Sequence, residues 1–195
     1  MKNVFSSLLA LSVFALLAFT APEKTYTIDK NQSQVKWKGE KVTGNHTGTI
    51  QLKDGKLTVN NNKLVGGSFT VDMASLSNED LEGENKGKLE GHLHSDDFFG
   101  TENHPEAKFV ITNVKPQSGN KYEVTGDLTI KEITKPVTFP ATVSIKNDKV
   151  TADATIKVDR TKYDIRYGSG SFFDGLGDKM IYDEFELNVS LVAKQ

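Results

Sequence analysis

The sequence predicts an all-β fold: an antiparallel barrel of about eight strands, with one α-helix inserted over about residues 78–93. Three observations support this. Apolar and polar residues alternate at period two in segment after segment, turn-forming residues separate these segments, and the alternation breaks between Met73 and Leu93. Antiparallel strands that each have one apolar face must close around a shared interior, and a barrel does so without long exposed edges.

Period-two alternation directs the apolar members of each segment to one face, which we expect to be the barrel interior. Turns are predicted at Asp54-Gly55, at 60–62, at 118–120 and at Asn147-Asp148. The expected inward sets, in chain order, are Val35 and Trp37; Phe69, Val71 and Met73; Phe109 and Ile111; Tyr122, Val124, Leu128 and Ile130; Val137, Phe139, Ala141, Val143 and Ile145; Val150, Ala152, Ala154, Ile156 and Val158; Phe185, Leu187, Val189 and Leu191.

The inserted helix is predicted to begin near Ser77, because Asp80 follows three places on, as in a capping pair. Three leucines fall within one third of the helical wheel and three glycines lie nearly opposite, on the expected solvent side. Each glycine costs a helix about 1 kcal/mol against alanine, so docking rather than propensity must hold it. It is either a poorly optimised surface helix or a mobile cover over the barrel mouth. The leucines are Leu81, Leu89 and Leu93, and the glycines are Gly83, Gly87 and Gly91.

The N-terminal residues have the form of a secretory signal peptide. Lys2 supplies a positive charge, an apolar run extends from Val4 to Phe19, and small residues end it at Ala21. The run is too short for a good spanning helix, although a retained membrane anchor is the alternative interpretation. We therefore expect a signal peptide over 1–21 and a single domain over 22–195, located in the periplasm or outside the cell.

Composition narrows the function classes. The chain has 195 residues, 24 Lys+Arg against 26 Asp+Glu, a net charge of −2 and no cysteine. This balance gives no electrostatic reason to expect nucleic-acid binding, and the lack of cysteine excludes disulfides, a thiol nucleophile and thiolate metal ligands. A membrane-spanning barrel would carry aromatic girdles at both strand ends. Here the aromatics fall mid-strand and the polar faces are dense in Lys, Glu and Asp, so we expect no membrane-spanning structure.

The histidines His92, His94 and His104 form the only dense group of candidate metal ligands. Their spacing matches no established zinc motif, and on a helix the first two diverge by about 200°. We expect no metal or cofactor, and a structural role in which His92 and Ser95 hydrogen-bond at the end of the helix. His46 is expected to be exposed in a turn.

Two further features lie outside the alternation. Arg160 and Arg166, the only arginines, lead into a glycine-rich loop at 166–178. They either form salt bridges to Asp159 or Asp164, or recognise an anionic lipid head group at the barrel mouth. Two adjacent phenylalanine pairs either pack in the core or line the entrance of an apolar cavity. These pairs are Phe98-Phe99 and Phe172-Phe173.

The stretch 89–114 is the least generic in the chain, and it resembles the hallmark of the YceI-like family of lipid- and polyisoprenoid-binding proteins. A block at 125–137 resembles the family's Gly-x-Leu-Thr-x-x-Gly-x-Thr-Lys-Pro-Val, and a block at 158–163 resembles its Arg-Ser/Thr-x-Phe/Tyr-Gly-Ile. Glu132 and Asp164 stand at expected turns where the family usually has glycine. The hallmark residues are His92, Leu93, Ser95, Asp97, Phe98, Phe99, Pro105 and Phe109.

The resemblance implies a lipocalin-like barrel with a helix, which binds a long apolar ligand such as a polyisoprenoid or a fatty-acid derivative. It implies no catalytic residues and no cofactor, and subunit pairing is common in the family, so a homodimer is possible. The candidate ligand-binding residues are Trp37, Phe69, Met73, Leu93, Phe98, Phe99, Phe109, Ile111, Leu128, Ile130, Phe139, Ile156, Arg160, Tyr163, Phe172 and Phe173.

Three functions follow from this sequence. The first is a non-catalytic binding protein whose interior holds an apolar chain, in a barrel of about eight strands that is just wide enough for one small ligand. Small inward residues, Gly126, Ala141, Ala152 and Ala154, would leave room for that chain. The second is a metal-dependent hydrolase that uses the histidine group. The third is a filled barrel that acts as an interaction module.

Overall fold

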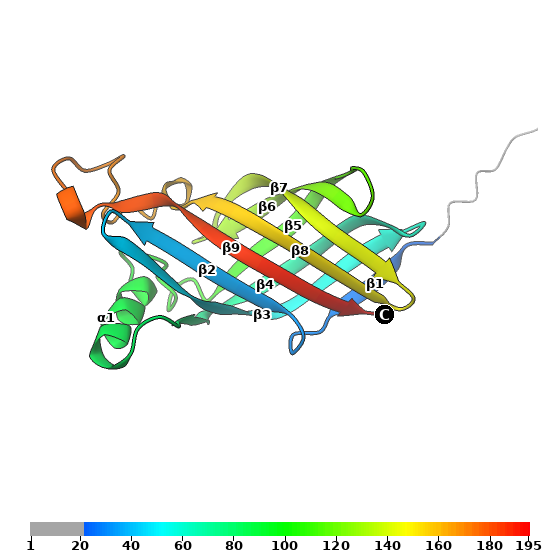
Figure 1. Cartoon of the computed structure of the whole chain (residues 1–195), viewed down its shortest axis with the longest axis horizontal. Coiled ribbons are helices and arrows are strands. Elements are labelled where there is room, and N and C mark those ends of the chain that lie inside the picture. Colours follow the sequence, from blue (N-terminus) through cyan, green and yellow to red (C-terminus); the bar gives the residue numbers. More distant parts are fainter. Residues whose placement is uncertain (1–21) are drawn as a thin grey trace, which may run out of the picture.

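The computed structural model describes residues 22–195, and Figure 1 shows the chain as a long barrel with one helix at one end. The signal peptide predicted at 1–21 lies outside the described residues. Two short 3-10 turns, η1 and η2, flank the loop before the last strand. The elements are β1 Lys24–Ile28, β2 Gln34–Lys41, β3 Gly44–Asn60, β4 Lys63–Asn78, α1 Gly83–His94, β5 Glu106–Pro116, β6 Lys121–Ile130, β7 Ile133–Lys146, β8 Lys149–Asp159, η1 Arg160–Tyr163, η2 Gly177–Lys179 and β9 Ile181–Lys194.

The sheet closes on itself. Every pairing between the named strands is antiparallel, the order is β1-β3-β2-β9-β8-β7-β6-β5-β4, and β3 also pairs with β4. β1 and β2 both pair with β3 and β9, at different heights, so together they fill one position of the barrel. The predicted antiparallel barrel of about eight strands with one inserted helix is therefore confirmed, with a ninth strand that extends an existing position.

The period-two alternation is confirmed as the pattern of burial. On β2, for example, Val35 and Trp37 are buried while Lys36 is exposed, and on β6 Tyr122 and Val124 are buried. The buried side chains form one continuous apolar core that runs the length of the barrel. Burial of these apolar faces, worth about 25 cal/mol per Å², is the main force that holds the sheet closed.

Three of the four predicted turns are confirmed, and one is wrong. Asn61 and Asn62 join β3 to β4 with positive φ, 118–120 joins β5 to β6, and Asn147 joins β7 to β8. Asp54-Gly55 instead lies inside β3, next to a register shift against β4. β3 pairs with β1 and β4 beyond this point, and these pairings carry the strand through a locally turn-like sequence.

The helix exists, but it begins later than predicted. Ser77 and Asn78 pair with β3 as the last residues of β4, and α1 starts at Gly83 without a side-chain cap. Long-range strand pairing thus overrides the local capping signal. An added Cβ at Gly83, Gly87 or Gly91 would meet nothing within 4 Å, so the glycines lie on the open side as expected.

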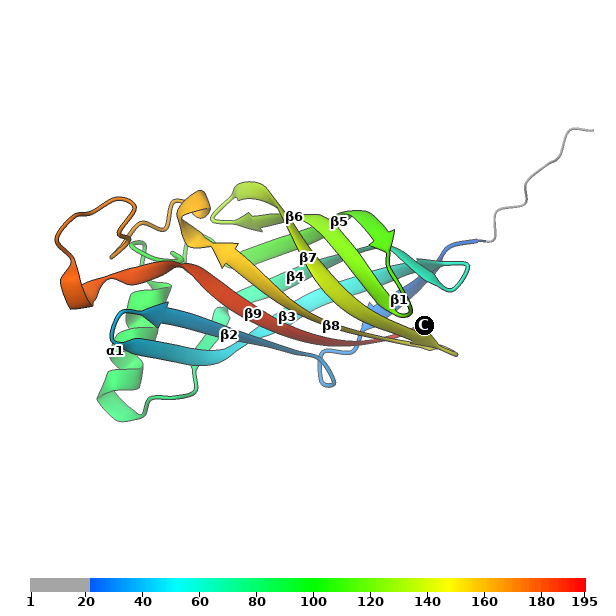
Figure 2. The ribbon, with the colours of Figure 1, turned by 45° about the horizontal axis from the view of Figure 1, so that its top comes forward.

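The barrel has two distinct ends. Figures 1 and 2 show α1, the β2–β3 hairpin and the loop between β8 and β9 at one end, which we call the α1 end. The C-terminus and the β7–β8 hairpin lie at the opposite end, which we call the C-terminal end. Most of the hallmark residues therefore gather around one mouth of the barrel.

Candidate functional site: an apolar cavity at the α1 end

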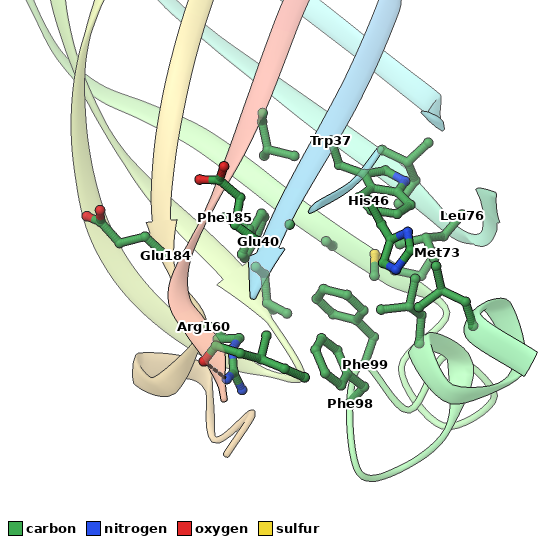
Figure 3. Close-up of a pocket in the computed structure, with 18 of the residues that line it drawn as sticks. Trp37, Glu40, His46, Met73, Leu76, Phe98, Phe99, Arg160, Glu184 and Phe185 are labelled. Atoms are coloured by element: carbon green, nitrogen blue, oxygen red, sulfur yellow. Dashed lines mark hydrogen bonds between the residues drawn. The ribbon is translucent and has the colours of Figure 1, made fainter. Parts of the chain in front are cut away.

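A cavity of about 270 Å³ lies inside the barrel at the α1 end, and Figure 3 shows most of the side chains that enclose it. Its size is near the lower end of the range for ligand pockets, ~300–1,000 Å³. Its walls are overwhelmingly apolar and come from α1, the turn after it, and strands β2, β3, β4, β5, β6 and β9. The apolar lining consists of Val35, Trp37, Gly39, Ile50, Val71, Met73, Leu76, Leu89, Leu93, Phe98, Phe99, Ala107, Leu128, Ile130, Ile181, Phe185 and Leu187.

Trp37 lies flat against the wall rather than across the cavity. Its cross-strand partner on β3 is Gly48, and a Cβ there would sit 2.6 Å from the indole ring. The indole N–H donates a hydrogen bond of 3.1 Å to the Ser77 carbonyl, which fixes the ring in place. The largest side chain of β2 therefore leaves the interior open.

Gly39 marks the space directly. It occupies the third inward position of β2, after Val35 and Trp37, and it pairs with Phe185, which also lines the cavity. A Cβ built on Gly39 would meet nothing within 4 Å, and its backbone has no positive φ. The interior at this height is thus empty because the sequence provides no side chain to fill it.

Phe98 and Phe99 form the wall beneath α1. Both are buried, their rings meet edge to face at 5.4 Å, and Phe99 also meets Phe185 edge to face at 6.2 Å. In Figure 3 the two rings lie together, with Arg160 on one side and Met73 and Leu76 on the other. The turn from Ser95 to His104 is held by backbone hydrogen bonds, including those that Phe98 and Gly100 donate to the Ser95 carbonyl.

Polar groups gather at the rim. Glu40, Lys41, His46, Tyr182 and Glu184 border the apolar lining, and two further polar residues, His92 of α1 and Arg160 of η1, also line the cavity. His46 lies in β3, half-buried, with Nδ1 2.8 Å from the Asp80 carboxylate, so the expectation that it is exposed in a turn is wrong. The cavity thus has an apolar body and a polar rim, a distribution that suits a molecule with an apolar tail and a polar head.

α1 is fastened over the cavity through the end of β4. The Glu90 carboxylate accepts hydrogen bonds from the Asn78 backbone N–H at 2.7 Å and from the Ser77 hydroxyl at 2.9 Å. The Asn78 N–H and the Ser77 hydroxyl stabilise the charged form and lower the pKa of Glu90, against the opposing effect of burial. Leu89 and Leu93 turn into the cavity from the same helix, so α1 both covers the site and forms part of its wall.

The buried Arg160 side chain links η1 to β9 through hydrogen bonds. It is 2% exposed, and it donates hydrogen bonds of 2.9–3.1 Å to the carbonyls of Ile165, Ile181 and Tyr182. Burial lowers the pKa of Arg160, which the carboxylates of Asp183, at 3.6 Å, and Asp159 oppose. Three N–H groups are therefore committed to the backbone.

The predicted salt bridges are partly correct. Arg166 pairs with Asp164 at 2.7 Å, as expected. The ion-pair partner of Arg160 is Asp183 on β9, not Asp159 or Asp164. Sequence proximity misses this partner because the loop at 166–178 folds back and brings β9 beside η1.

The histidines do not converge. His94 uses both ring nitrogens, with Nδ1 2.9 Å from the Thr101 hydroxyl and Nε2 3.1 Å from the Leu76 carbonyl. The His92 ring packs edge to face against Phe98 and Tyr167, while its backbone carbonyl accepts the Ser95 hydroxyl at 2.7 Å, which confirms the expected helix-end contact. Within residues 22–195, no three His, Asp or Glu side chains are grouped as a metal ion would require.

The structure divides the sixteen candidate ligand-binding residues into three groups. Eight line the cavity: Trp37, Met73, Leu93, Phe98, Phe99, Leu128, Ile130 and Arg160. Six lie elsewhere in the core or beside it: Phe69, Phe109, Ile111, Phe139, Ile156 and Tyr163. Phe172 and Phe173 are about half exposed, on the loop before β9.

Sequence reasoning missed several lining residues. Gly39 was the most informative omission, and its signal was a glycine where the alternation of β2 calls for an inward apolar side chain. Leu76 and Leu89 fall in the segment where the alternation breaks, so only the docking of α1 reveals their role. The small residues Gly126, Ala141, Ala152 and Ala154, expected to leave room, are not among the lining residues.

Over residues 22–195, no helix has both the length and the apolar character needed to cross a bilayer.

Known proteins match this chain over most of its length. A family model for the YceI-like domain matches residues 26–193. A UPF0312 protein of Pseudomonas putida strain W619 is 36% identical over 145 residues, 73% of this chain and 73% of that protein. Protein YceI of Escherichia coli O157:H7 is 34% identical over 94 residues, 48% of this chain and 47% of that protein.

Solved structures share the fold. BcnA of Burkholderia cenocepacia superposes with a TM-score of 0.70 at 25% identity, over 86% of this chain and 99% of that one. A polyisoprenoid-binding domain from Saccharophagus degradans, implicated in plant cell wall breakdown, gives a TM-score of 0.62 at 12% identity, over 87% and 97% of the two chains. The match to the family model and the extent of the Pseudomonas alignment establish that this chain belongs to the YceI-like family.

Proposed function

We propose that this protein binds the apolar chain of a lipid or isoprenoid in the cavity at the α1 end, without catalysing a reaction on it. The observation that carries the proposal is the unfilled interior beside Gly39, enclosed by apolar side chains. Each methylene group that moves from water into such a site contributes about 0.8 kcal/mol. The polyisoprenoid-binding neighbour of the same fold supports an apolar ligand.

The polar head of the ligand is proposed to sit at the rim, near Glu40, Lys41, His46 and Glu184. Arg160 is a poor candidate for head-group recognition, since three of its N–H groups already bind carbonyl oxygens. A binding role without chemistry also agrees with Trp37, whose indole N–H at the cavity wall is held in an internal hydrogen bond to the Ser77 carbonyl.

Native mass spectrometry of the protein purified from its own host tests the proposal. We expect a bound apolar mass that organic solvent extracts chemically unchanged. A Gly39→Leu variant should lose this mass, because the new side chain enters the cavity at a position where its Cβ meets no atom within 4 Å. Gly87→Leu, on the open face of α1, adds the same side chain outside the cavity and should retain the mass. Equal retention by both variants would contradict the proposed site.

We also propose that the protein acts after export, in the periplasm or outside the cell, as the signal-like segment at 1–21 suggests. Fractionation of the host, with antibody detection of the protein, tests this directly. Recovery from the periplasm or the medium, at a mass that lacks the first ~20 residues, is the expected result. A full-length protein in the cytoplasm would contradict it.

A further inference from the structure

We infer that Phe69, Phe109 and Phe139 form a floor across the barrel that limits the length of chain the cavity accepts. This inference rests on the proposed function, and it names the ligand class more narrowly: molecules whose buried part is a single apolar chain of about twelve carbons. It follows from the strand register, the ring contacts and the depth of the cavity.

The register places Phe69 and Phe109 at the inner edge of the cavity, where the partner of Phe109 on β6, Leu128, still lines it. Val71 on β4 pairs with Ala107 on β5, and both line the cavity. Two residues further along each strand, the next inward pair is Phe69 and Phe109, which are not among the lining residues. Side chains two apart on a strand share a face, so these rings are the next side chains that an entering chain would meet.

The rings are packed against one another and seated on glycines. Phe69 and Phe109 stack with centroids 6.4 Å apart, and Phe109 lies 5.5 Å from buried Phe139. A Cβ at Gly126 would sit 2.3 Å from the Phe109 ring, and one at Gly55 would sit 2.8 Å from the Phe69 ring. Both rings therefore occupy space that is open only because residues 126 and 55 are glycines.

The depth above this floor sets the chain length. On β9 the lining residues run from Ile181 to Leu187, about 20 Å of strand at ~3.3 Å per residue. With a strand tilt of ~40° this corresponds to about 15 Å along the barrel axis. An extended alkyl chain with bonds of ~1.5 Å advances about 1.25 Å per carbon, so about twelve carbons fit. A longer polyisoprenoid would leave the remainder of its chain outside the mouth.

The proposed limit on chain length can be tested with straight-chain fatty acids of about 8 to about 18 carbons. Their affinities are measured by displacement of N-phenyl-1-naphthylamine. Affinity should rise roughly fourfold per methylene up to about twelve carbons and then stay level. We call the chain length at which the affinity stops rising the break. Phe109→Ala removes the central ring and should move this break to longer chains. Val71→Phe adds a ring one layer above the floor and should move the break to shorter chains. Because this variant removes no core volume, it keeps the test possible if Phe109→Ala does not fold.

Phe185→Leu is the matched control, since Phe185 lines the side wall and not the floor. It should change the affinity for all lengths without moving the break. A wild-type affinity that keeps rising to about 18 carbons, or a break that Val71→Phe leaves in place, would overturn the floor while leaving apolar-chain binding intact. Failure of wild type to bind any chain length would instead overturn the proposed function itself.

Discussion

Both halves of the barrel have glycines at inward strand positions, but the space in front of these glycines differs between the two halves. At the α1 end, Gly48 of β3 lets the Trp37 indole lie flat against the sheet, and Gly39 of β2 faces empty space. Toward the C-terminal end, Gly126 seats the Phe109 ring, which packs on its aromatic neighbours Phe69 and Phe139. A glycine at an inward position therefore either seats a large ring, as Gly48 and Gly126 do, or marks a vacancy, as Gly39 does.

This contrast assigns different roles to the two halves. The filled half contains side chains with essentially no exposure, such as Tyr26, Leu57, Val150 and Ala193, and we expect truncations there to cost more stability than truncations beside the cavity. The hollow half gives up part of that packing and provides the binding volume. Three predictions sharpen or break this division, in order of decreasing effect.

The largest expected effect comes from the same truncation made in each half. Leu57→Ala, at 2% exposure in the filled half, should lower the free energy of unfolding by about 3 kcal/mol, because it removes contacts and leaves a cavity. Leu187→Ala should cost about half as much, since Leu187 already borders empty space. Urea denaturation followed by fluorescence of Trp37 measures both. Equal losses would show that the hollow half is packed as well as the filled half.

Acid should loosen the α1 end before the rest. The pKa of Glu90 is lowered in the folded state by the Asn78 N–H and the Ser77 hydroxyl. The ionised carboxylate therefore stabilises the folded state at pH values above its unfolded pKa of 4.5. That stability is lost as pH falls through the folded pKa. The hydrogen bonds that Glu90 accepts should contribute about 1 kcal/mol to the docking of α1.

Hydrogen exchange measured between about pH 5 and about pH 3 checks this prediction. Protection factors over 83–94 should fall, while those of β8 amides near Val150 stay constant. Glu90→Gln cannot titrate and should show a smaller fall. A helix as protected at low pH as the strands would exclude both the acid effect and a mobile cover.

The smallest effect concerns two hairpins of the same backbone shape. Asn61-Asn62 joins β3 to β4 at the C-terminal end, and Lys131-Glu132 joins β6 to β7 at the α1 end; all four residues have positive φ. Asparagine tolerates this region and glutamate does so less well. Glu132→Gly should therefore raise the free energy of unfolding by about 1 kcal/mol, which thermal denaturation detects as a higher midpoint. Asn62→Gly should change the free energy of unfolding little. The opposite order would mean that the Glu132 side chain stabilises the turn.

Much of this fold was predictable from the sequence, because strands alternate locally and the Asn-rich turns have positive φ that few other residues tolerate. The errors share one cause. Ser77 and Asn78 end β4 rather than start a helix, and Asp54-Gly55 continues β3 rather than turning, since pairing with β3, β4 and β1 outweighs local preference. The ion pair of Arg160 with Asp183 is likewise set by a contact between segments more than 20 residues apart.

The sequence by itself determined which side chains face inward and, through its motif, which family the chain resembles. Only the tertiary structure decided which part of that interior is empty. In the sequence, Trp37 and Leu187, which line the cavity, cannot be told from Phe69 and Phe109, which do not. All four are apolar residues at inward positions of a period-two pattern. Whether these side chains meet or stand apart depends on strand register and on which glycine lies opposite, and both are fixed by pairings between distant strands.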